Sequence, residues 1–418
     1  MKKLPKISNG VHFIGIGGIG VSALARYYLA KGHQVSGSDL VASEITQALK
    51  KKGAKITINS QLARNVLANM DLVIYSPAVP ENNPELKQAK KLGIKCLSYP
   101  QALGELTKKH FTIAVCGTHG KSTTTAMIGL LLVKAGLDPT VIVGTKVKEF
   151  GNTNCKVGKS KYLVIEADEH FASFLNYWPK IIVLTNIEAD HLDYYKNIKN
   201  VRRAFKEFIS HLPKDGKLIT AKKIERKLTS VVKIPGRHNL QNATLALKTA
   251  RALKIPDRIS FKSLSEYRGS WRRFEVRQGK VGKKKITIVS DYGHHPTEIK
   301  ATLQAAREKW PEAKIWCLYQ PHQYQRTYYL FKDFVKVFRQ VPIDRIIITD
   351  IYDVAGREEK EIKKRTNSKK LIKAINKKWT VYVPKKKILN YLRKNLRGRE
   401  VVVVMGAGDI YEIDKSLK

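Results

Sequence analysis

Short apolar runs and amphipathic helical segments alternate along the first quarter of the chain. The apolar runs have the length and composition of buried strands, and the segments between them repeat apolar positions at helical spacing. Alternation of this kind is typical of a parallel sheet whose faces are covered by helices. We expect strands at residues 11–16, 34–37, 71–75 and 94–97, and helices at 20–30 and 84–92.

The same alternation starts again twice further along the chain. A second series predicts strands at 111–116, 162–165 and 181–184, with helices at 122–135 and 239–253. A third begins near Trp271 and predicts strands at 286–289, 314–318, 345–348 and 401–405. The pattern therefore predicts an α/β protein with three domains in series, at 1–108, 109–270 and 271–418. A chain of 418 residues is long enough, at roughly 100 to 200 residues a domain.

A glycine-rich turn separates the first predicted strand from the first predicted helix. It has the pattern G-x-G-x-x-G, formed by Gly15, Ile16, Gly17, Gly18, Ile19 and Gly20. Glycine allows a tight turn and a close approach of the backbone to a diphosphate, which then faces a helix N-terminus. Asp39 ends the next strand, where folds of this kind often hold a ribose hydroxyl. The turn predicts a Rossmann-like domain that binds a diphosphate-bearing nucleotide, although a turn needed only for packing is the alternative.

A phosphate-binding loop follows the first strand of the second series. It is formed by Gly117, Thr118, His119, Gly120, Lys121, Ser122 and Thr123. Its backbone N–H groups can hold phosphates, Lys121 can reach the terminal ones, and the Ser122 hydroxyl can bind Mg²⁺. The general pattern has its first glycine where this chain has Val115, and here the glycine comes two residues later. A central P-loop ATPase domain is the prediction.

Carboxylates and a histidine follow two further strands of the central series. Glu166 begins the segment EADE after residues 162–165, and His191 ends the segment TNIEADH after residues 181–184. Because parallel strands end at the same edge of a sheet, these side chains should converge on the loop at Ser122. Carboxylates and a neutral histidine are reasonable ligands for Mg²⁺ bound to phosphates, so a metal site is predicted there.

Three more segments are dense in polar functional groups. Asn239 and Asn242 lie at the start of a predicted helix, where Asn239 could instead be a helix cap. The segments at 291–296 (DYGHHP) and 320–326 (QPHQYQR) each follow a predicted strand. Their histidines could form a catalytic pair, a metal site or helix caps, and the residues alone do not decide between these.

Charge is the unusual feature of the composition. The chain has 78 Lys and Arg residues against 35 Asp and Glu residues, a formal net charge of +43. Such an excess attracts polyanions, which suggests nucleic-acid binding. However, the basic residues are spread along the chain without an aromatic-interleaved patch, so lysine enrichment on solvated faces is the favoured interpretation and no specific nucleic acid is expected.

The remaining composition points to the cytoplasm. The four cysteines are scattered and fit neither a disulfide framework nor a zinc site, which suits a reducing compartment. No apolar stretch is long enough for a transmembrane helix, so no membrane insertion is expected. Residues 1–25 imitate a secretory signal, but their apolar part contains four glycines and has the nucleotide-binding pattern described above.

Taken together, these motifs resemble the Mur ligase family of peptidoglycan synthesis. The resemblance covers nearly the whole chain, with segments in the family's order: HFIGIGGIGVSALA, GSDL, NNPEL, GTHGKSTTTAM, EADE, TNIEADHLDYY, GRHNLQNA, RRFE, DYGHHPTE and QPHQYQRT. DYGHHPTE with a QPH segment is similar to the member that adds alanine, the first amino acid. The resemblance implies a UDP-sugar-binding Rossmann-like domain, a central ATPase domain and a Rossmann-like C-terminal domain that closes over both.

The resemblance also implies a reaction and roles for individual residues. The lactyl carboxylate of UDP-N-acetylmuramate would take the terminal phosphoryl group of ATP, and the amine of L-alanine would attack the acyl phosphate. Lys121, Glu166, His191 and Arg273 would be catalytic, with two Mg²⁺ ions, one on Ser122 and Glu166 and one on His191. The remaining implied ligands are Asn239, Asn242 and Asp291 for ATP, Tyr292, His294 and Arg326 for the amino acid, and Gly15, Gly17, Gly18, Ile19, Gly20 and Asp39 for the UDP-sugar.

The chain departs from the family's pattern at several points. Gln323 stands where the second arginine of the QPH segment is usual, and Ser290 replaces the first of two aspartates before the YGHHP run. Asn59 and Ser60 stand where glycine and histidine are expected, and the stretch at 224–234 is shorter than in relatives. A trimmed but active enzyme is the favoured interpretation.

Two other functions remain as alternatives. A sister ligase that attaches a preformed tripeptide to the same sugar nucleotide during wall recycling would share the central motifs. A nucleic-acid-dependent P-loop ATPase would account for the charge and predicts salt-sensitive binding to DNA or RNA. The residues do not tell whether L-alanine is preferred to glycine or L-serine, because one methyl group changes affinity by only about 1–3 kcal/mol.

Overall fold

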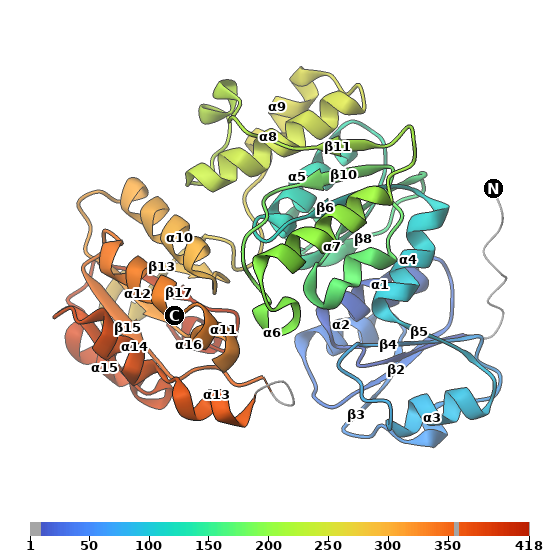
Figure 1. Cartoon of the computed structure of the whole chain (residues 1–418), viewed down its shortest axis with the longest axis horizontal. Coiled ribbons are helices and arrows are strands. Elements are labelled where there is room, and N and C mark those ends of the chain that lie inside the picture. Colours follow the sequence, from blue (N-terminus) through green and yellow to red (C-terminus); the bar gives the residue numbers. More distant parts are fainter. Residues whose placement is uncertain (1–9, 355–358, 418) are drawn as a thin grey trace.

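Three α/β units follow one another along the chain (Figure 1). The structure is a computed structural model that describes residues 10–354 and 359–417. The basic start of the chain, Met1 to Lys3, lies outside the described residues. Each unit contains one sheet, of five, six and six strands in chain order. Within the described ranges, every helix is too short or too polar to cross a bilayer.

The first unit has the all-parallel sheet order β3-β2-β1-β4-β5, as expected for a Rossmann-like domain. Its strands are β1 (Val11–Ile14), β2 (Val35–Asp39), β3 (Lys55–Ile58), β4 (Leu72–Tyr75) and β5 (Lys95–Ser98). Its helices are α1 (Ile19–Ala30), α2 (Glu44–Lys51), η1 (Ala63–Asn65), α3 (Pro84–Lys91) and α4 (Tyr99–Lys109). Strand β1 is buried along its whole length, because helices cover both faces of a parallel sheet.

The central unit has the sheet order β11-β10-β6-β9-β7-β8, parallel except for the last pair. Its strands are β6 (Phe111–Cys116), β7 (Thr140–Val147), β8 (Thr153–Lys156), β9 (Tyr162–Glu166), β10 (Ile181–Leu184) and β11 (Lys217–Ile219). Its helices are α5 (Lys121–Lys134), η2 (Lys148–Phe150), η3 (His170–Asn176), α6 (Leu192–Tyr195), α7 (Ile198–Ser210), η4 (Arg226–Thr229), α8 (Arg237–Ala252) and α9 (Asp257–Glu266). The short stretch at 224–234 contains the single turn η4.

The third unit has the sheet order β12-β13-β17-β14-β15-β16, with an antiparallel hairpin β12–β13 at one edge. Its strands are β12 (Glu275–Val281), β13 (Lys284–Asp291), β14 (Ile315–Tyr319), β15 (Arg345–Ile348), β16 (Thr380–Tyr382) and β17 (Val401–Met405). Its helices are α10 (Pro296–Lys309), α11 (Tyr324–Tyr329), α12 (Phe331–Gln340), α13 (Lys360–Arg365), α14 (Ser368–Ile375), η5 (Lys385–Lys387), α15 (Ile388–Asn395) and α16 (Tyr411–Ser416).

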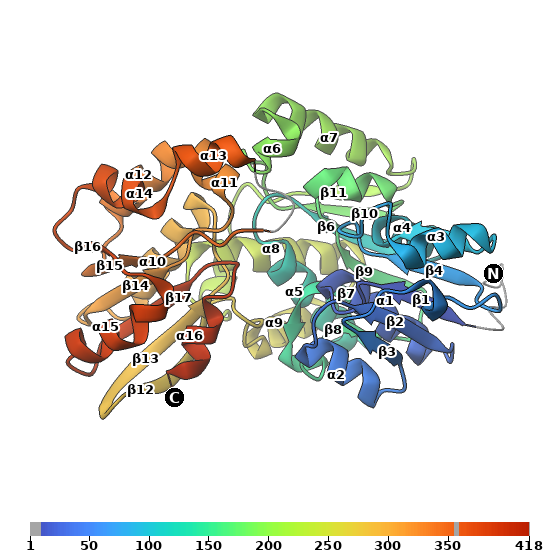
Figure 2. The same ribbon diagram turned by 90° about the horizontal axis from the view of Figure 1, so that it is seen from below.

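The units differ in how they are joined. The first and central units share one continuous apolar core, to which both β1 and α7 contribute, whereas the third unit has cores of its own. The third unit lies at one end of the molecule and the first at the other (Figure 2). A single carboxylate touches all three: Glu44 accepts hydrogen bonds from Lys146 at 3.0 Å and from Lys415 at 2.8 Å. This exposed contact adds little stability, but it shows that the third unit touches the other two near Glu44.

Candidate active site

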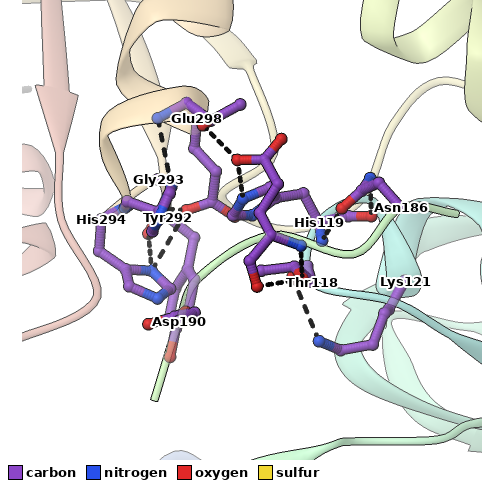
Figure 3. Close-up of polar contacts among 12 residues, drawn as sticks. Thr118, His119, Lys121, Asn186, Asp190, Tyr292, Gly293, His294 and Glu298 are labelled. Atoms are coloured by element: carbon purple, nitrogen blue, oxygen red, sulfur yellow. Dashed lines mark hydrogen bonds and ion pairs between the residues drawn. The ribbon is translucent and has the colours of Figure 1, made fainter. Parts of the chain in front are cut away.

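The loop between β6 and α5 has the geometry of a phosphate cradle. Gly117 and Gly120 have φ of 130° and 82°, in the region that favours glycine. A Cβ on Gly117 would lie 2.0 Å from the Thr185 hydroxyl, and one on Gly120 would lie 2.4 Å from the Asn242 side-chain oxygen. The backbone N–H of His119 donates to the side chain of Asn186 at 3.0 Å (Figure 3). The ends of strands β6 and β10 therefore fix a loop in which positions 117 and 120 have no room for a side chain.

Lys121 lies at the start of α5 and is paired with Glu169. Its Nζ donates to the Glu169 carboxylate at 2.8 Å and to the Gly117 carbonyl at 2.8 Å, and lies 3.8 Å from Asp168. Burial opposes the charge on Lys121, but Glu169, Asp168 and Glu166 outweigh it and raise its pKa. Burial also raises the pKa of Glu169 to about 7. Glu169 is a buried partner that the sequence did not single out, although it ends the acidic segment of Glu166.

The acidic residues form two groups beside Lys121. The Ser122 hydroxyl donates to Glu166 at 2.9 Å, and Glu166 also accepts from the Gly144 N–H at 2.7 Å. His191 instead groups with Asp168 and Glu169, and their potential ligand atoms lie within 4.8 Å of one another. Burial lowers the pKa of His191, which favours the neutral imidazole that binds metals. The donor sets, a hydroxyl with a carboxylate and two carboxylates with a histidine, fit divalent cations.

The third unit reaches this loop through Arg273 and α10. The Arg273 guanidinium lies 3.4 Å from the Ser122 hydroxyl and 4.0 Å from Glu298, with its carbon 5.0 Å from the centre of the Tyr292 ring. The His119 ring lies 3.3 Å from Glu298 on α10 and 3.4 Å from Glu188 of the central unit. Glu188 also accepts from Thr297 at 2.6 Å. These contacts, part of which Figure 3 shows, fasten the two units together at the phosphate loop.

The His119 cluster predicts a pH-dependent stability. Burial disfavours the charge on His119, but Glu188 and Glu298 outweigh it and raise its pKa to about 9. A raised pKa means stability that is complete below the ordinary value of about 6.5 and is lost as pH rises through 9. The melting temperature should therefore fall between pH 7 and 9.5. The free energy of unfolding should decrease over this range by a few kcal/mol at most, because one unit of pKa shift corresponds to about 1.4 kcal/mol.

A His119→Gln variant tests the source of this pH dependence. The other groups facing His119 do not titrate in that range: Glu188 has its pKa lowered to about 2, that of Glu298 is well below its ordinary value, and that of His295 is lowered by burial. The variant should be less stable at pH 7 and should lose most of the slope above it. If the melting temperatures of the two proteins fall equally steeply between pH 7 and 9.5, His119 is ruled out as the titrating group.

Residues of the DYGHHP and QPH segments converge next to Arg273. The His294 Nδ1–H donates to the Tyr292 carbonyl at 3.1 Å, and burial lowers the pKa of His294 to about 3. Arg326, on α11, donates from Nε to Asp190 at 3.0 Å, and both side chains are buried. Arg326 is thus partly neutralised by a residue of the central unit that the sequence did not single out. His294 and His322 are both held neutral by burial, which leaves Arg326 as the cation of this group.

One cavity collects side chains from all three units. This central cavity, of about 330 Å³, is lined by Ile19 of the first unit, by the loop and acidic residues of the second, and by the third-unit residues around Arg326. The expected site residues on its surface are Ile19, Thr118, Gly120, Lys121, Ser122, Glu166, His191, Arg273, Tyr292, His294 and Arg326. Positive and negative groups of the central and third units therefore face the same space.

A second cavity, of about 300 Å³, is lined by the phosphate loop and by helix α8, and is called here the α8 cavity. Its lining includes the expected residues His119, Gly120, Thr123, Asn239, Asn242, Arg273 and Asp291. The helix α8 has Gly236 at its N-cap with no side-chain cap, so the alternative role of Asn239 as a cap is wrong. Asn239 instead donates to the Pro235 carbonyl at 2.7 Å. The Asp291 carboxylate accepts from the N–H groups of Phe274 and Gly293, both at 2.8 Å, and so also holds the RRFE segment in place.

A third cavity, of about 320 Å³, is lined by residues of the glycine-rich turn and by Glu166. Gly18, Ile19 and Gly20 line this glycine-turn cavity, whereas Gly15, Gly17 and Asp39 are not among its lining residues. The Asp39 carboxylate accepts from the Gly17 N–H at 2.7 Å and so holds the turn in shape. Glu166 and Ile19 line both this cavity and the central one, so the two spaces adjoin.

Family models match three consecutive segments of the chain. They are described as "Mur ligase family, catalytic domain" at residues 10–111, "Mur ligase middle domain" at 115–230 and "Mur ligase, glutamate ligase domain" at 272–408.

Two curated relatives are similar over nearly the full chain. A UDP-N-acetylmuramate–L-alanine ligase of Acetivibrio thermocellus is 39% identical, covering 96% of this chain and 94% of its own. A protein of the same name from Clostridium acetobutylicum is 37% identical, covering 97% of each chain.

Solved structures share the arrangement as well. The UDP-N-acetylmuramate–alanine ligase of Thermotoga maritima superposes with a TM-score of 0.78 at 28% identity, covering 98% of each chain. A murein peptide ligase of Psychrobacter arcticus superposes with a TM-score of 0.71 over 98% of each chain, at 22% identity, which bears on the fold alone.

Proposed function

The chain belongs to the Mur ligase family, and from that premise we propose that it joins L-alanine to the lactyl carboxylate of UDP-N-acetylmuramate in an ATP-dependent ligation. The reaction is an early step of peptidoglycan synthesis and takes place in the cytoplasm. The observation that carries the proposal is the central cavity, which residues of all three units line and into which the central and third units bring charged groups. A sugar nucleotide, a phosphoryl donor and an amino acid can meet there, since the glycine-turn cavity and the α8 cavity each share lining residues with the central cavity.

The residues support a phosphoryl transfer followed by an acyl transfer. The lactyl carboxylate would take the terminal phosphoryl group of ATP, with the bridging oxygen leaving on ADP. The amine of L-alanine would attack the resulting acyl phosphate, lose a proton and expel inorganic phosphate. Transfer between two anions needs positive charge at the transferring group more than it needs covalent chemistry. Lys121 supplies that charge from the central unit, and Arg273 supplies it from the third.

ATP and Mg²⁺ fit the residues that surround Lys121. Gly117 and Gly120 let the loop pack closely against Thr185 and Asn242, and Asn239, Asn242 and Asp291 line the adjoining α8 cavity, where the adenosine would lie. Two Mg²⁺ ions are proposed, one held by Ser122 and Glu166 and one by His191 with its carboxylate neighbours. Bound Mg²⁺ would neutralise part of the negative charge of the phosphates. Lys121 and Arg273 would neutralise more of it.

The proposed amino-acid site combines one cation with neutral histidines. Arg326 would pair with the carboxylate of L-alanine by exchanging its longer contacts, from Nη2 to Asp190 at 3.5 Å and from Nη1 to His322 at 3.2 Å, while its Nε stays on Asp190 at 3.0 Å. Gln323, which replaces the usual arginine, also lines the central cavity but brings no charge. The pocket therefore binds the amino-acid carboxylate through a single cation. Tyr292 and His294 line the same space beside it.

Phosphate release from ATP tests the proposal directly. Release should require both UDP-N-acetylmuramate and L-alanine, and mass spectrometry should find the ligated product. Glycine and L-serine in place of L-alanine measure the preference of the pocket. Release with a preformed tripeptide instead of L-alanine would indicate the wall-recycling ligase. Release that is stimulated by nucleic acid and indifferent to the sugar nucleotide would overturn the proposal in favour of the ATPase.

A further inference from the structure

Three aromatic rings form a continuous stack that ends at His191, next to Asp168 and Glu169. The rings of Phe171 and His170 lie 4.2 Å apart at 28°, and those of His170 and His191 lie 4.2 Å apart at 22°. The Tyr194 ring meets Phe171 edge to face at 5.2 Å. One end of the stack is thus His191, a proposed metal ligand. The other end, Phe171, is 47% exposed, so a large apolar ring faces solvent.

The backbone under Phe171 is strained. Phe171 and Ala172 have φ of 52° and 53°, two consecutive left-handed residues that are not glycine. This backbone conformation is strained for residues other than glycine, and strain of this kind gathers at ligand-binding segments. The turn is held by the Ala172 N–H on the Glu169 carbonyl at 2.8 Å and by the Phe174 N–H on the Asp168 carbonyl at 3.0 Å. The protein therefore maintains, against strain, a turn whose apolar side chain is not buried by the fold.

The exposed end of the stack lies inside the glycine-turn cavity. Phe171 and His170 both line that cavity, together with Gly18–Gly20 of the turn and Glu166. His170 also lines the central cavity with Lys121. A sugar nucleotide with its diphosphate at the glycine turn and its reacting carboxylate near Lys121 must place its sugar between these two points. Phe171 and His170 belong to the wall of the cavity that contains the turn and adjoins the space at Lys121.

We propose that Phe171, backed by His170, is a platform for the pyranose ring of the sugar nucleotide and thereby determines where the reacting carboxylate lies. The inference rests on the proposed function. One face of a pyranose ring carries mainly C–H groups, and covering an exposed aromatic ring with them removes apolar surface from water. Full burial of a phenylalanine side chain strengthens an interaction by roughly tenfold to a hundredfold, and about half of this ring remains to be covered. Loss of the ring should therefore weaken sugar-nucleotide binding by about tenfold.

Calorimetric binding of UDP-N-acetylmuramate and of UDP alone separates the sugar from the rest of the ligand. Phe171→Ala should raise the Kd for UDP-N-acetylmuramate about tenfold and leave the Kd for UDP unchanged, because UDP has no sugar at that position. The KM for the sugar nucleotide should rise similarly, with the KM for ATP unchanged. Phe171→Tyr keeps the ring and should bind as the parent protein does. Trp178→Ala is the matched control, since Trp178 is also 47% exposed and stacks on a histidine, His211, at 4.4 Å.

The outcomes distinguish the platform from the proposed function. If the parent protein binds no UDP-N-acetylmuramate, the proposed function itself fails. If the parent binds it and Phe171→Ala binds it equally well, the platform is overturned. If Phe171→Ala weakens UDP and UDP-N-acetylmuramate equally, the ring contacts the nucleotide or the fold is damaged, and the platform is again overturned. A loss confined to the sugar nucleotide, absent in Trp178→Ala and in Phe171→Tyr, supports it.

Discussion

Replacing Lys121 by alanine should lower kcat for ligation by at least about 10³-fold. Removal of a single preorganised donor at a developing charge typically costs 10²–10³, and removal of a cation at a transferring phosphoryl group costs about 10³–10⁵. Lys121 begins α5 at the phosphate loop and is held charged by Glu169, Asp168 and Glu166. Single-turnover phosphate release with UDP-N-acetylmuramate and L-alanine measures the loss. It should appear mainly in kcat, because the charge acts most strongly on the transferring group.

Two further variants show whether the loss is chemical. Lys134→Ala removes a lysine from the other end of α5, whose Nζ pairs with Glu266 at 2.6 Å on an exposed face, and should keep activity within about twofold. The double variant Lys121→Ala/Glu169→Gln removes the buried carboxylate together with its cation. It should regain stability that Lys121→Ala alone loses, but not activity. Near-parental kcat in Lys121→Ala would contradict the role given to this lysine.

Buried strands could be read from the sequence, whereas of the edge strands only β5 was expected, at 94–97. The expected strands at 11–16, 111–116, 181–184 and 401–405 correspond to β1, β6, β10 and β17, which are central or next to central and almost entirely buried. Strand β3 (KITI) and strand β11 (KLI) escaped the pattern, because edge strands are short and half exposed. Strand β7 escaped for another reason: Gly144 interrupts its apolar run and resembles a turn, whereas here it leaves room for the Glu166 carboxylate, 2.8 Å from an added Cβ.

Site residues carried by local patterns could be predicted, whereas their partners could not. Lys121 and Ser122 follow from the loop pattern alone, because strand, glycine and helix occur within one stretch of chain. Glu169 and Asp190 have no such pattern, since their pairing with Lys121 and Arg326 depends on how separate segments pack. Glu298 is similar: in the sequence it is a polar residue early in a helix, yet it contacts His119 of another unit.

Arg273→Ala is expected to lower kcat by about 10²- to 10³-fold while leaving the KM for the sugar nucleotide nearly unchanged. Arg273 comes from the third unit, and its guanidinium lies 3.4 Å from the Ser122 hydroxyl at the phosphate loop. Its contribution therefore exists only when the third unit lies over the central one. The glycine-turn cavity is lined by the first and central units, so sugar-nucleotide binding does not require it. Arg273→Lys should recover part of the loss, because lysine restores the charge without the planar fork of donors.

The neighbouring arginine gives the sharpest control. Arg272 is buried, donates to the Gly406 carbonyl, and lies 5.1 Å from the Tyr292 ring centre and 4.9 Å from that of Tyr411. Arg272→Ala should therefore lower the melting temperature more than Arg273→Ala does, and Arg268→Ala, at an exposed position, should change neither the melting temperature nor kcat. Two adjacent arginines that look equivalent in the sequence thus differ because one side chain points into its own unit and the other across the interface. Equal loss of stability in both variants would remove the distinction and leave Arg273 with a structural role only.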